Sequence, residues 1–290
     1  MKLMAKRLAS LALALVFLWA LLPGGVLAAT IVDSGTCSAS LTWTLDNAGT
    51  LTISGTGAMN DYITMDWPWG QSNVTKVVIE DGVTTIGRYA FYWCNNMTSV
   101  TIPASVTEIG DTAFYECTSL TSVTIPEGVT SIGSYAFFGC SSLTSFTAAS
   151  GNSHFSSKNG LLLNKEQTEL VLCPSGKSSA VTIPSTVTAI GDDAFKGCGK
   201  LTSITIPAGV SNSMTGSWFE RCSRLTSFNV DSANATYCSV DGLLYNKAKT
   251  ILICCPAGKT GAITLPAGMT EKRCPLAKSR KSRRSRRIRR

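Results

Sequence analysis

Hydrophobic and polar positions recur along most of the chain with a period of 23 residues. Residues 100–122 read Val-Thr-Ile-Pro-Ala-Ser-Val-Thr-Glu-Ile-Gly-Asp-Thr-Ala-Phe-Tyr-Glu-Cys-Thr-Ser-Leu-Thr-Ser, and this order of residue types returns in residues 123–145 and 181–203. Residues 77–99 form an earlier copy, and residues 204–227 form a drifted copy that is one residue longer. A fixed period of this length indicates a repeat architecture in which each unit is one small structural element.

The first part of each unit predicts a short strand. Val123 and Ile125 alternate with Ser122 and Thr124, so the apolar side chains point to one side of the strand and the hydroxyl groups to the other. Pro126 has no N–H group to donate to a neighbouring strand, and it therefore ends this one. We expect the apolar side to face a core.

The second part of each unit predicts a bend and a return of the chain. Val129 and Ile132 are apolar again, and Gly133 permits a tight turn. Residues 136–140, Ala-Phe-Phe-Gly-Cys, predict a short helical or 3₁₀ return. One unit is then one turn of a coil. Because a unit this small cannot bury its own apolar side, coils must stack on one another, with parallel strands ~4.8 Å apart.

Two longer segments interrupt the short units. Residues 146–180 and 228–262 are each 35 residues long and match one another. We interpret each as an enlarged repeat that carries a β-hairpin, with strands near residues 161–163 and 169–172 and a turn at residues 164–168 in the first. The matched blocks are Gly160-Leu-Leu-Leu-Asn-Lys with Gly242-Leu-Leu-Tyr-Asn-Lys, and Cys173-Pro-Ser-Gly-Lys with Cys255-Pro-Ala-Gly-Lys.

Residues 29–75 precede the repeat but share its chemistry. Leucine and tryptophan alternate with threonine in residues 41–45, residues 46–49 (Asp-Asn-Ala-Gly) are a turn signal, and the alternation resumes in residues 50–53, which together predict a hairpin. The first coil would otherwise expose its apolar end to water. We therefore expect this segment to be an N-terminal β cap.

The repeated blocks Val-Thr-Ile-Pro, Ile-Gly-x-x-Ala-Phe and Cys-x-x-Leu-Thr-Ser resemble the BspA-like, or Treponema pallidum-type, leucine-rich repeat of bacterial surface proteins. The resemblance covers residues 76 to about 270, and residues 37–69 are similar to the segment that often precedes such repeats. It implies an extracellular location, a right-handed superhelix, and a role in adhesion or protein binding. It implies no catalytic residues.

The expected fold is thus a β-rich α/β solenoid, a leucine-rich-repeat superhelix of about eight coils with a parallel sheet, short returns and a β-hairpin cap. The expected organisation is a signal peptide at 1–28, the cap at 29–75, the solenoid at 76–271 and a basic disordered tail at 272–290.

The start of the chain has the composition of a secretory signal. Lys2, Lys6 and Arg7 precede an apolar run over residues 8–22, and small residues lead up to Ala28. The alternative is an uncleaved membrane anchor, but the run is shorter than the roughly 20 residues that a spanning helix needs. We expect a secreted or cell-surface protein with no transmembrane span in the mature chain.

The net charge of +8 is unevenly distributed. Of the 26 Lys and Arg residues, 3 lie in residues 1–28 and 11 in residues 272–290, so 12 remain against all 18 Asp and Glu residues, a net of about −6. We therefore expect no nucleic-acid binding by the folded body.

The basic tail follows a repeat that starts normally and stops before its return. Residues 263–270 follow the pattern, whereas residues from Lys278 onward are almost entirely Lys, Arg and Ser, which cannot form a core. One interpretation is a cationic arm for anionic cell wall, lipid or nucleic acid. The other, which we favour, is a frameshift or truncation in a gene that encodes further coils.

The 11 cysteines have two interpretations. Five occupy one repeat position, where a buried ladder of small apolar side chains explains them better than disulfides do. The others are less constrained, and a bridge within the second insert is an open alternative. The five are Cys94, Cys117, Cys140, Cys198 and Cys222.

Residue types for catalysis are scarce. The chain has a single histidine, His154, in the first insert, and it has no Gly-x-Ser-x-Gly block or phosphate-binding glycine loop. Acidic residues recur at coil positions that we expect to be exposed to solvent. We expect no enzyme activity, no cofactor and no metal.

Three surfaces are candidates for binding. Aromatic side chains recur at Tyr92, Tyr115 and Phe138, with Trp93 beside them, and half-exposed aromatics favour contact with a partner or sugar. The alternative is that they extend the core. Outward hydroxyls at Thr101, Thr124 and Thr205 form a second candidate, although threonine also simply suits strands. A third, with Trp67, Trp69 and Tyr62, fits cap packing better than a ligand platform.

The sequence therefore predicts an extracellular recognition or adhesion module that binds protein or glycan through its repeat surface. The alternatives are the repeat region of a larger surface enzyme whose catalytic domain is not in this chain, and a passive spacer of the cell envelope.

Overall fold

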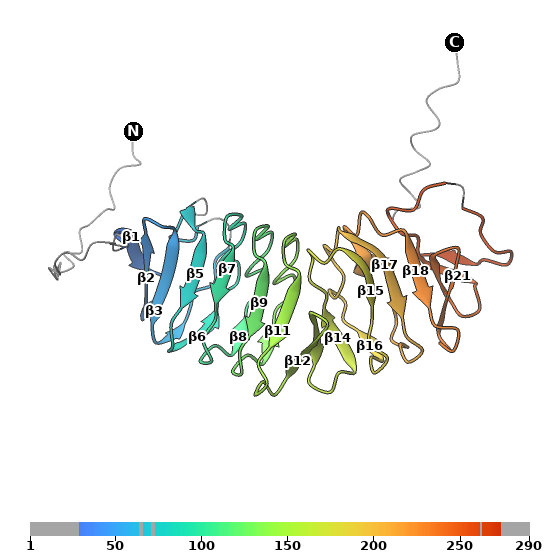
Figure 1. Cartoon of the computed structure of the whole chain (residues 1–290), viewed down its shortest axis with the longest axis horizontal. Coiled ribbons are helices and arrows are strands. Elements are labelled where there is room, and N and C mark those ends of the chain that lie inside the picture. Colours follow the sequence, from blue (N-terminus) through green and yellow to red (C-terminus); the bar gives the residue numbers. More distant parts are fainter. Residues whose placement is uncertain (1–28, 64–65, 71–72, 262, 274–290) are drawn as a thin grey trace, which may run out of the picture.

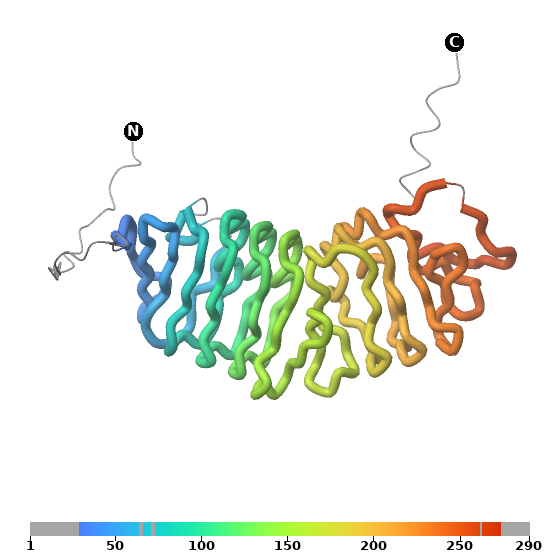
Figure 2. Tube along the Cα trace, in the orientation of Figure 1, coloured from blue at the N-terminus to red at the C-terminus, as the bar shows by residue number. Residues whose placement is uncertain are grey.

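The computed structural model describes residues 29–63, 66–70, 73–261 and 263–273, which wind into a β-solenoid of about nine turns. Successive coils stack side by side in sequence order from the N-terminal to the C-terminal end (Figures 1 and 2). This confirms the predicted fold class, with one coil more than expected. The predicted signal peptide and most of the basic tail lie outside the described residues.

A three-stranded antiparallel hairpin stack opens the solenoid. The alternating pattern of residues 41–45 places Leu41, Trp43 and Leu45 in the core. The turn after β2 is held by the Asp46 carboxylate, which accepts the N–H of Thr50 at 2.8 Å, and this hydrogen bond lowers the Asp46 pKa. The strands are β1 (Ile31–Thr36), β2 (Leu41–Asp46) and β3 (Thr50–Gly55).

The third strand of the cap, β3, has an antiparallel neighbour on one side and a parallel neighbour on the other. β3 pairs in parallel with β5, the first strand of the repeat, in register from Thr50 opposite Lys76 to Ile53 opposite Ile79. The cap therefore covers the apolar end of the first coil with paired strands, as the sequence predicts.

Each later coil contributes a strand to one side of the solenoid, here called the Val-Thr-Ile side. β9 and β11 pair in parallel with Ser122 opposite Ser145 and Thr124 opposite Thr147. Val123 is buried while Thr124 is exposed, as the period of two predicts. The strands are β5 (Lys76–Ile79), β7 (Ser99–Thr101), β9 (Ser122–Ile125), β11 (Ser145–Ala148), β15 (Ser179–Thr182), β17 (Leu201–Ile206) and β18 (Ser227–Val230).

A second, shorter row of parallel strands, the Ile-Gly side, forms mainly from the Thr-x-Ile-Gly block of the units. Within it, β4, β6, β8 and β10 make one four-stranded sheet, and β16 and β22 each join the last strand of an insert. The strands are β4 (Gly57–Ala58), β6 (Val83–Ile86), β8 (Glu108–Ile109), β10 (Ser131–Ile132), β16 (Ala189–Ile190) and β22 (Glu271–Lys272).

The returns are chains of tight turns rather than helices. In the first coil, Ala90, Tyr92 and Cys94 each donate their N–H to the carbonyl three residues earlier. A helix cannot continue, because the residue before each cysteine has a left-handed backbone, as in Trp93 (φ 60°) and Gly139 (φ 73°). Among the returns, the predicted 3₁₀ form is present as η2 (Gly216–Phe219).

Each insert adds a β-hairpin between a Val-Thr-Ile strand and the next strand of the Ile-Gly side, so that three strands form an antiparallel unit. The predicted strands are present, and each insert also contains an unpredicted strand before them. The last strand of each unit joins the Ile-Gly side in parallel. The strands are β12 (Phe155–Lys158), β13 (Leu161–Asn164) and β14 (Glu169–Leu172) in the first, and β19 (Tyr237–Val240), β20 (Leu243–Asn246) and β21 (Ile251–Cys254) in the second.

A fully buried asparagine ties each insert to the coil before it. The amide of Asn152 donates to the carbonyls of Pro126 and Val129, and its oxygen accepts the N–H groups of His154 and Phe155. Asn234 repeats this pattern in the second insert. All four bonding positions of the side chain are filled, which makes its burial tolerable.

Two ladders fill the core beneath the returns. Phe91, Phe114 and Phe137 stack at 5.2 Å between successive rings. Beside them, Cys117 donates its thiol to the carbonyl of Phe91 at 3.0 Å, and Cys140 bonds to Phe114 in the same way. The cysteines of this repeat position are buried free thiols, so the core interpretation is confirmed for Cys94, Cys117, Cys140, Cys198 and Cys222.

Threonines join the coils at two corners. Thr98 donates both its N–H (2.8 Å) and its hydroxyl (3.1 Å) to the carbonyl of Thr75, one coil earlier. Thr121 and Thr144 repeat the arrangement on that corner, and Thr107 and Thr130 do so on the Ile-Gly side. The abundance of threonine is therefore partly structural.

Candidate binding surface

The outer side of the returns carries a line of aromatic rings, here called the aromatic flank. Tyr92 and Tyr115 stack with ring centroids 5.0 Å apart, and Tyr115 and Phe138 stack at the same distance. Trp93 stacks on Tyr92 at 5.5 Å, and Trp67 contacts it from the cap side at 6.1 Å. The structure thus brings together the four aromatic residues that the sequence singled out.

Their exposure differs along the line. Trp93 is 42% exposed, and Tyr92 and Tyr115 are half-buried, whereas Phe138 is only 5% exposed. The guanidinium of Arg221 lies 5.0 Å from the Phe138 ring centroid and covers it. The flank therefore offers Trp93, Tyr92 and Tyr115 to solvent, and Phe138 belongs to its packed end.

The position before each cysteine lies on this flank. In chain order it holds Trp93, Glu116, Gly139, Gly197 and Arg221, all with a left-handed backbone. Glu116 and Arg221 reach across the two glycines and form an ion pair of 2.6 Å. A Cβ on Gly139 would lie 2.6 Å from the Glu116 carboxyl carbon, so glycine is required for the bridge to pass.

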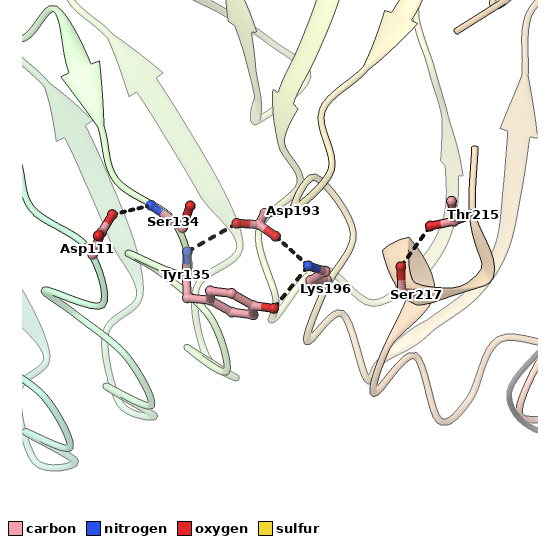
Figure 3. A network of polar contacts seen from close by, with 7 residues as sticks. All are labelled: Asp111, Ser134, Tyr135, Asp193, Lys196, Thr215 and Ser217. Atoms are coloured by element: carbon pink, nitrogen blue, oxygen red, sulfur yellow. Dashed lines mark hydrogen bonds and ion pairs between the residues drawn. The ribbon is translucent and has the colours of Figure 1, made fainter. Parts of the chain in front are cut away.

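A polar clamp lies beyond the aromatic flank, where the first insert separates two coils (Figure 3). Lys196 donates to the Asp193 carboxylate at 2.7 Å and to the Tyr135 hydroxyl at 3.0 Å, and its ammonium lies 4.6 Å from the Tyr135 ring centroid. The second Asp193 oxygen accepts the N–H of Tyr135 at 3.2 Å. These contacts join residues about 60 positions apart in sequence.

Further polar contacts flank the clamp in Figure 3. The Asp111 carboxylate accepts the N–H of Ser134 at 2.8 Å, one coil on, and the hydroxyls of Thr215 and Ser217 lie 2.7 Å apart. The first contact ties neighbouring coils together, and the second lies within one return.

The candidate threonines lie elsewhere, on the Val-Thr-Ile side. Thr101 and Thr124 are exposed, and Thr205 is half-buried. Thr205 lines a groove of about 470 Å³, which the sequence does not predict. The groove forms because the hairpin tip at residues 158–159 stands beside the ends of β15, β17 and β18. The aromatic and hydroxyl candidates thus belong to two different sides of the coil.

The third candidate surface is interior. Trp69 is fully buried, and Trp67 and Tyr62 are each 8% exposed. Trp69 meets Trp43 at 6.1 Å and Tyr62 at 5.7 Å, edge to face. These rings seal the cap against the first phenylalanine of the ladder.

Groups for metal or thiol chemistry do not converge in the described part of the chain. It holds no cluster of three or more His, Cys, Asp or Glu residues placed to bind a metal. His154 contacts the neighbouring Ser153 hydroxyl at 2.9 Å. Burial raises the pKa of the Cys94 thiol to about 12, so this thiol stays protonated at neutral pH.

Between residues 29 and 273, apart from the short gaps, no helix is long and apolar enough to cross a membrane.

The repeat decides the family. The model of the BspA type leucine-rich-repeat region matches residues 69–160 and 173–254, in six copies that together span more than half of the chain. The chain belongs to the BspA-type leucine-rich-repeat family. No curated protein resembles this BspA-type chain closely enough to count as a match.

Several solved bacterial structures are similar to this BspA-type protein. A leucine-rich repeat protein from Eubacterium ventriosum is 24% identical, with 83% of this chain and 77% of that chain covered and a TM-score of 0.42. The pneumococcal vaccine antigen PcpA is 14% identical, with 68% and 70% covered and a TM-score of 0.43. A leucine-rich cell surface protein from Faecalibacterium prausnitzii is 17% identical, with 69% and 95% covered and a TM-score of 0.32.

Proposed function

We propose that this BspA-type protein is an exported recognition module that binds a protein partner through the aromatic flank. The export signal that the composition of residues 1–28 predicts and the cell-surface description of one similar protein support the location. The flank supports the activity. The sequence left protein and glycan open as ligands, and the packing of the rings favours protein.

One observation carries the proposal. Trp93 adopts φ 60° at a repeat position where two later coils have Gly139 and Gly197. A non-glycine residue there costs about 1 kcal/mol. Glu116 and Arg221 have a structural reason to occupy the position, since they pair with each other. Trp93 stacks on Tyr92 but leaves its large indole 42% exposed, and exposed apolar surface of this kind suits a partner.

The stacking geometry favours a protein over a sugar. Tyr92 from the coil before and Phe138 from the coil after cover the two faces of the Tyr115 ring, so its edge and hydroxyl remain for a ligand. Sugars need an open ring face on which to stack. Tryptophan, tyrosine and arginine together, by contrast, dominate the energetics of protein interfaces. The Tyr89 ring lies 5.4 Å from Tyr92 of the flank, centroid to centroid, and the Arg88 guanidinium lies 5.0 Å from the Tyr89 ring centroid, which adds an arginine beside the flank.

The test is binding of the protein to arrays of extracellular-matrix proteins and glycans. We expect saturable binding to a protein, with an affinity at least tenfold lower for Trp93→Gly. That substitution introduces the glycine that two later coils have at the equivalent positions 139 and 197, so it should leave the fold intact. Thr124→Ala is the matched control on the Val-Thr-Ile side and should bind normally.

Other outcomes contradict the proposal in distinct ways. Loss of binding in Thr124→Ala but not in Trp93→Gly would move the site to the strands. Binding to glycans alone would exclude a protein ligand. Binding to nothing would favour a passive spacer, and turnover of a peptide or glycan would favour an enzyme.

A further inference from the structure

The tip of the first insert's hairpin lies between two sheets of the Val-Thr-Ile side. β9 and β11 form one of these sheets, and β15, β17 and β18 form the next. The Gly160 carbonyl accepts the N–H of Phe146 in β11 at 2.9 Å, which joins the tip to the first sheet. The Asn159 carbonyl accepts a hydrogen bond from the Lys177 ammonium at 2.8 Å, close to the start of β15. The tip is therefore held from both sides.

The held tip forms one wall of the groove that Thr205 lines, which measures about 470 Å³. The floor consists of the carboxyl ends of three parallel strands and the residues that follow them, at positions 182–185, 205–207 and 229–231. Because β15, β17 and β18 are neighbours in one sheet, the groove crosses three successive coils. Its volume lies in the range of specific ligand sites, which is roughly 300–1,000 Å³.

The lining of the groove combines apolar and polar groups. The apolar side chains are buried in the floor, whereas polar side chains are exposed along it. An extended peptide matches this mixture, since its backbone carries donors and acceptors while alternate side chains point toward the floor. The apolar residues are Ile183, Pro184, Ile206 and Pro207, and the exposed polar residues are Thr182, Ser185 and Asn229.

The two ends of the groove carry opposite charges. Lys158 is exposed on the hairpin wall, and Asp231 is exposed directly after β18, beyond β15 and β17. One oxygen of the Asp231 carboxylate accepts the N–H of Ala233 at 2.9 Å, which fixes this group at its end of the groove. At ~4.8 Å per strand, two to three strand spacings place the two charges roughly 10–15 Å apart.

The matched insert segments show that neither charge is needed for the fold. Alignment of residues 146–180 with residues 228–262 places Lys158 opposite Val240 and Asp231 opposite Ala149. Each charge thus replaces a neutral residue of the matched segment, although both segments fold in the same way. The two charges nevertheless lie at the two ends of one groove, which is what recognition of a dipolar ligand requires.

We propose that this groove binds an extended peptide segment of a partner protein, with one acidic and one basic side chain four residues apart. The acidic side chain pairs with Lys158 and the basic one with Asp231. An extended chain rises ~3.3 Å per residue, so four steps cover about 13 Å, which matches the separation of the two charges. A neutral glycan would leave both charges without a counterpart. The charges select and orient the segment, while the apolar floor supplies contact area.

The groove and the aromatic flank lie on different sides of the coil, so this proposal does not rest on the proposed function. The probe is the peptide Asp-Ala-Val-Ala-Lys with blocked ends, coupled in several copies to one carrier so that multivalency strengthens weak single contacts. Binding to the immobilised full chain is measured by surface plasmon resonance. We expect it to bind about threefold or more tightly than Asp-Ala-Val-Ala-Asp and Lys-Ala-Val-Ala-Lys, since each of these meets one like charge.

Charge reversal at one end gives the sharpest test. Lys158→Glu makes both ends of the groove acidic, so we expect the preference to change from the mixed-charge peptide to the doubly basic one. Lys158 is exposed, and the substitution leaves the core unchanged. Lys200→Glu is the matched control, because Lys200 is exposed beside the opposite end of β17 and should leave the preference as it is.

A bulky substitution locates the bound peptide. Thr182 is exposed on the floor, so Thr182→Trp should fill the groove and reduce binding of the mixed-charge peptide at least tenfold. Thr124 occupies the same repeat position in β9, away from the hairpin wall, and is also exposed. Thr124→Trp should therefore bind the peptide like the parent protein.

Four outcomes overturn the proposal. No binding of the mixed-charge peptide, or equal binding of all three peptides, would show that the charges do not select a peptide. An unchanged preference in Lys158→Glu would exclude Lys158 as the partner of the acidic side chain. Peptide binding that is lost in Trp93→Gly but kept in Thr182→Trp would place the peptide on the aromatic flank. Binding of a neutral glycan that Thr182→Trp abolishes, without peptide binding, would make the groove a sugar site.

Discussion

The two inserts of this protein share a length, a sequence pattern and a buried asparagine, yet their surroundings differ. The first lies between two described coils and leaves a space of about 10 Å³ above residues 173–176, here called the sealed junction, while the second is followed by a coil described only as far as Arg273 and leaves about 440 Å³ beside residues 254–257. The difference teaches that an insert does not complete its own core. In a solenoid, each unit depends on the neighbour that follows it.

The largest expected difference concerns the phenylalanine ladder at the two junctions. Phe195→Ala in the sealed region should cost about 3–5 kcal/mol of unfolding free energy, because the cavity has packed walls on all sides. Phe219→Ala should cost at least about 1 kcal/mol less, since Phe219 lines the larger space of about 440 Å³ and is less completely surrounded. Urea unfolding measures both, and Thr124→Ala serves as an exposed control. Equal losses for the two phenylalanines would contradict this difference in packing.

Alkaline pH should produce the next largest effect. Burial raises the pKa of Cys222 from 9.0 to about 12, so its thiolate fraction at pH 8.5 falls about 1000-fold relative to the unfolded chain. Since the unfolded chain loses this proton first, the free energy of unfolding is unaffected below pH 9.0 and declines as the pH rises toward 12.

Alkylation by iodoacetamide, followed by mass spectrometry, checks this expectation at each cysteine. Cys198 lies in the return that closes the sealed junction and Cys222 lines the larger space, and both should react far more slowly in the native protein than in urea. Native Cys222 reacting at the unfolded rate would contradict the burial that the structure assigns to it.

The smallest effect should come from the polar clamp of the sealed junction, which Lys196, Asp193 and Tyr135 form. Lys196→Met removes the hydrogen bonds to Asp193 and Tyr135 while retaining the bulk of the side chain, and should cost about 1 kcal/mol. Lys200→Met, in the same coil but exposed, is the matched control and should be neutral. A loss as large in Lys200→Met as in Lys196→Met would mean that the clamp does not stabilise the junction.

The strands could be predicted from the sequence because their information is local. The alternation of Ser122 to Ile125 and the proline after it define a strand on their own, and repetition removes the ambiguity. The cap followed from the same alternation in residues 41–45. The insert strands at residues 161–164 and 169–172 were found from apolar runs.

The returns could not be predicted correctly from residue types. Ala-Phe-x-x-Cys fits a helical turn, but the left-handed backbone at Trp93 and Glu116 interrupts it. That conformation is set by a hydrogen bond to the next coil, from the N–H of Trp93 to the carbonyl of Tyr115, which a single unit does not contain. The glycines at positions 139 and 197 were the available signal.

The sequence predicted which residues belong to the candidate surfaces, but not how their side chains are arranged. Tyr92, Trp93 and Tyr115 do lie together, because the 23-residue period places them in adjacent coils. The cover that Arg221 provides for Phe138 joins residues more than 80 positions apart and leaves no local pattern.

The threonine corners have a consequence for how such a chain grows over evolutionary time. Each corner threonine carries its own two donors and needs only a carbonyl that every preceding coil supplies. A duplicated stretch of gene that encodes one unit therefore arrives with its attachment already encoded. Copies can be gained or lost without compensating changes elsewhere, so the length of the protein is free to vary while the fold is kept.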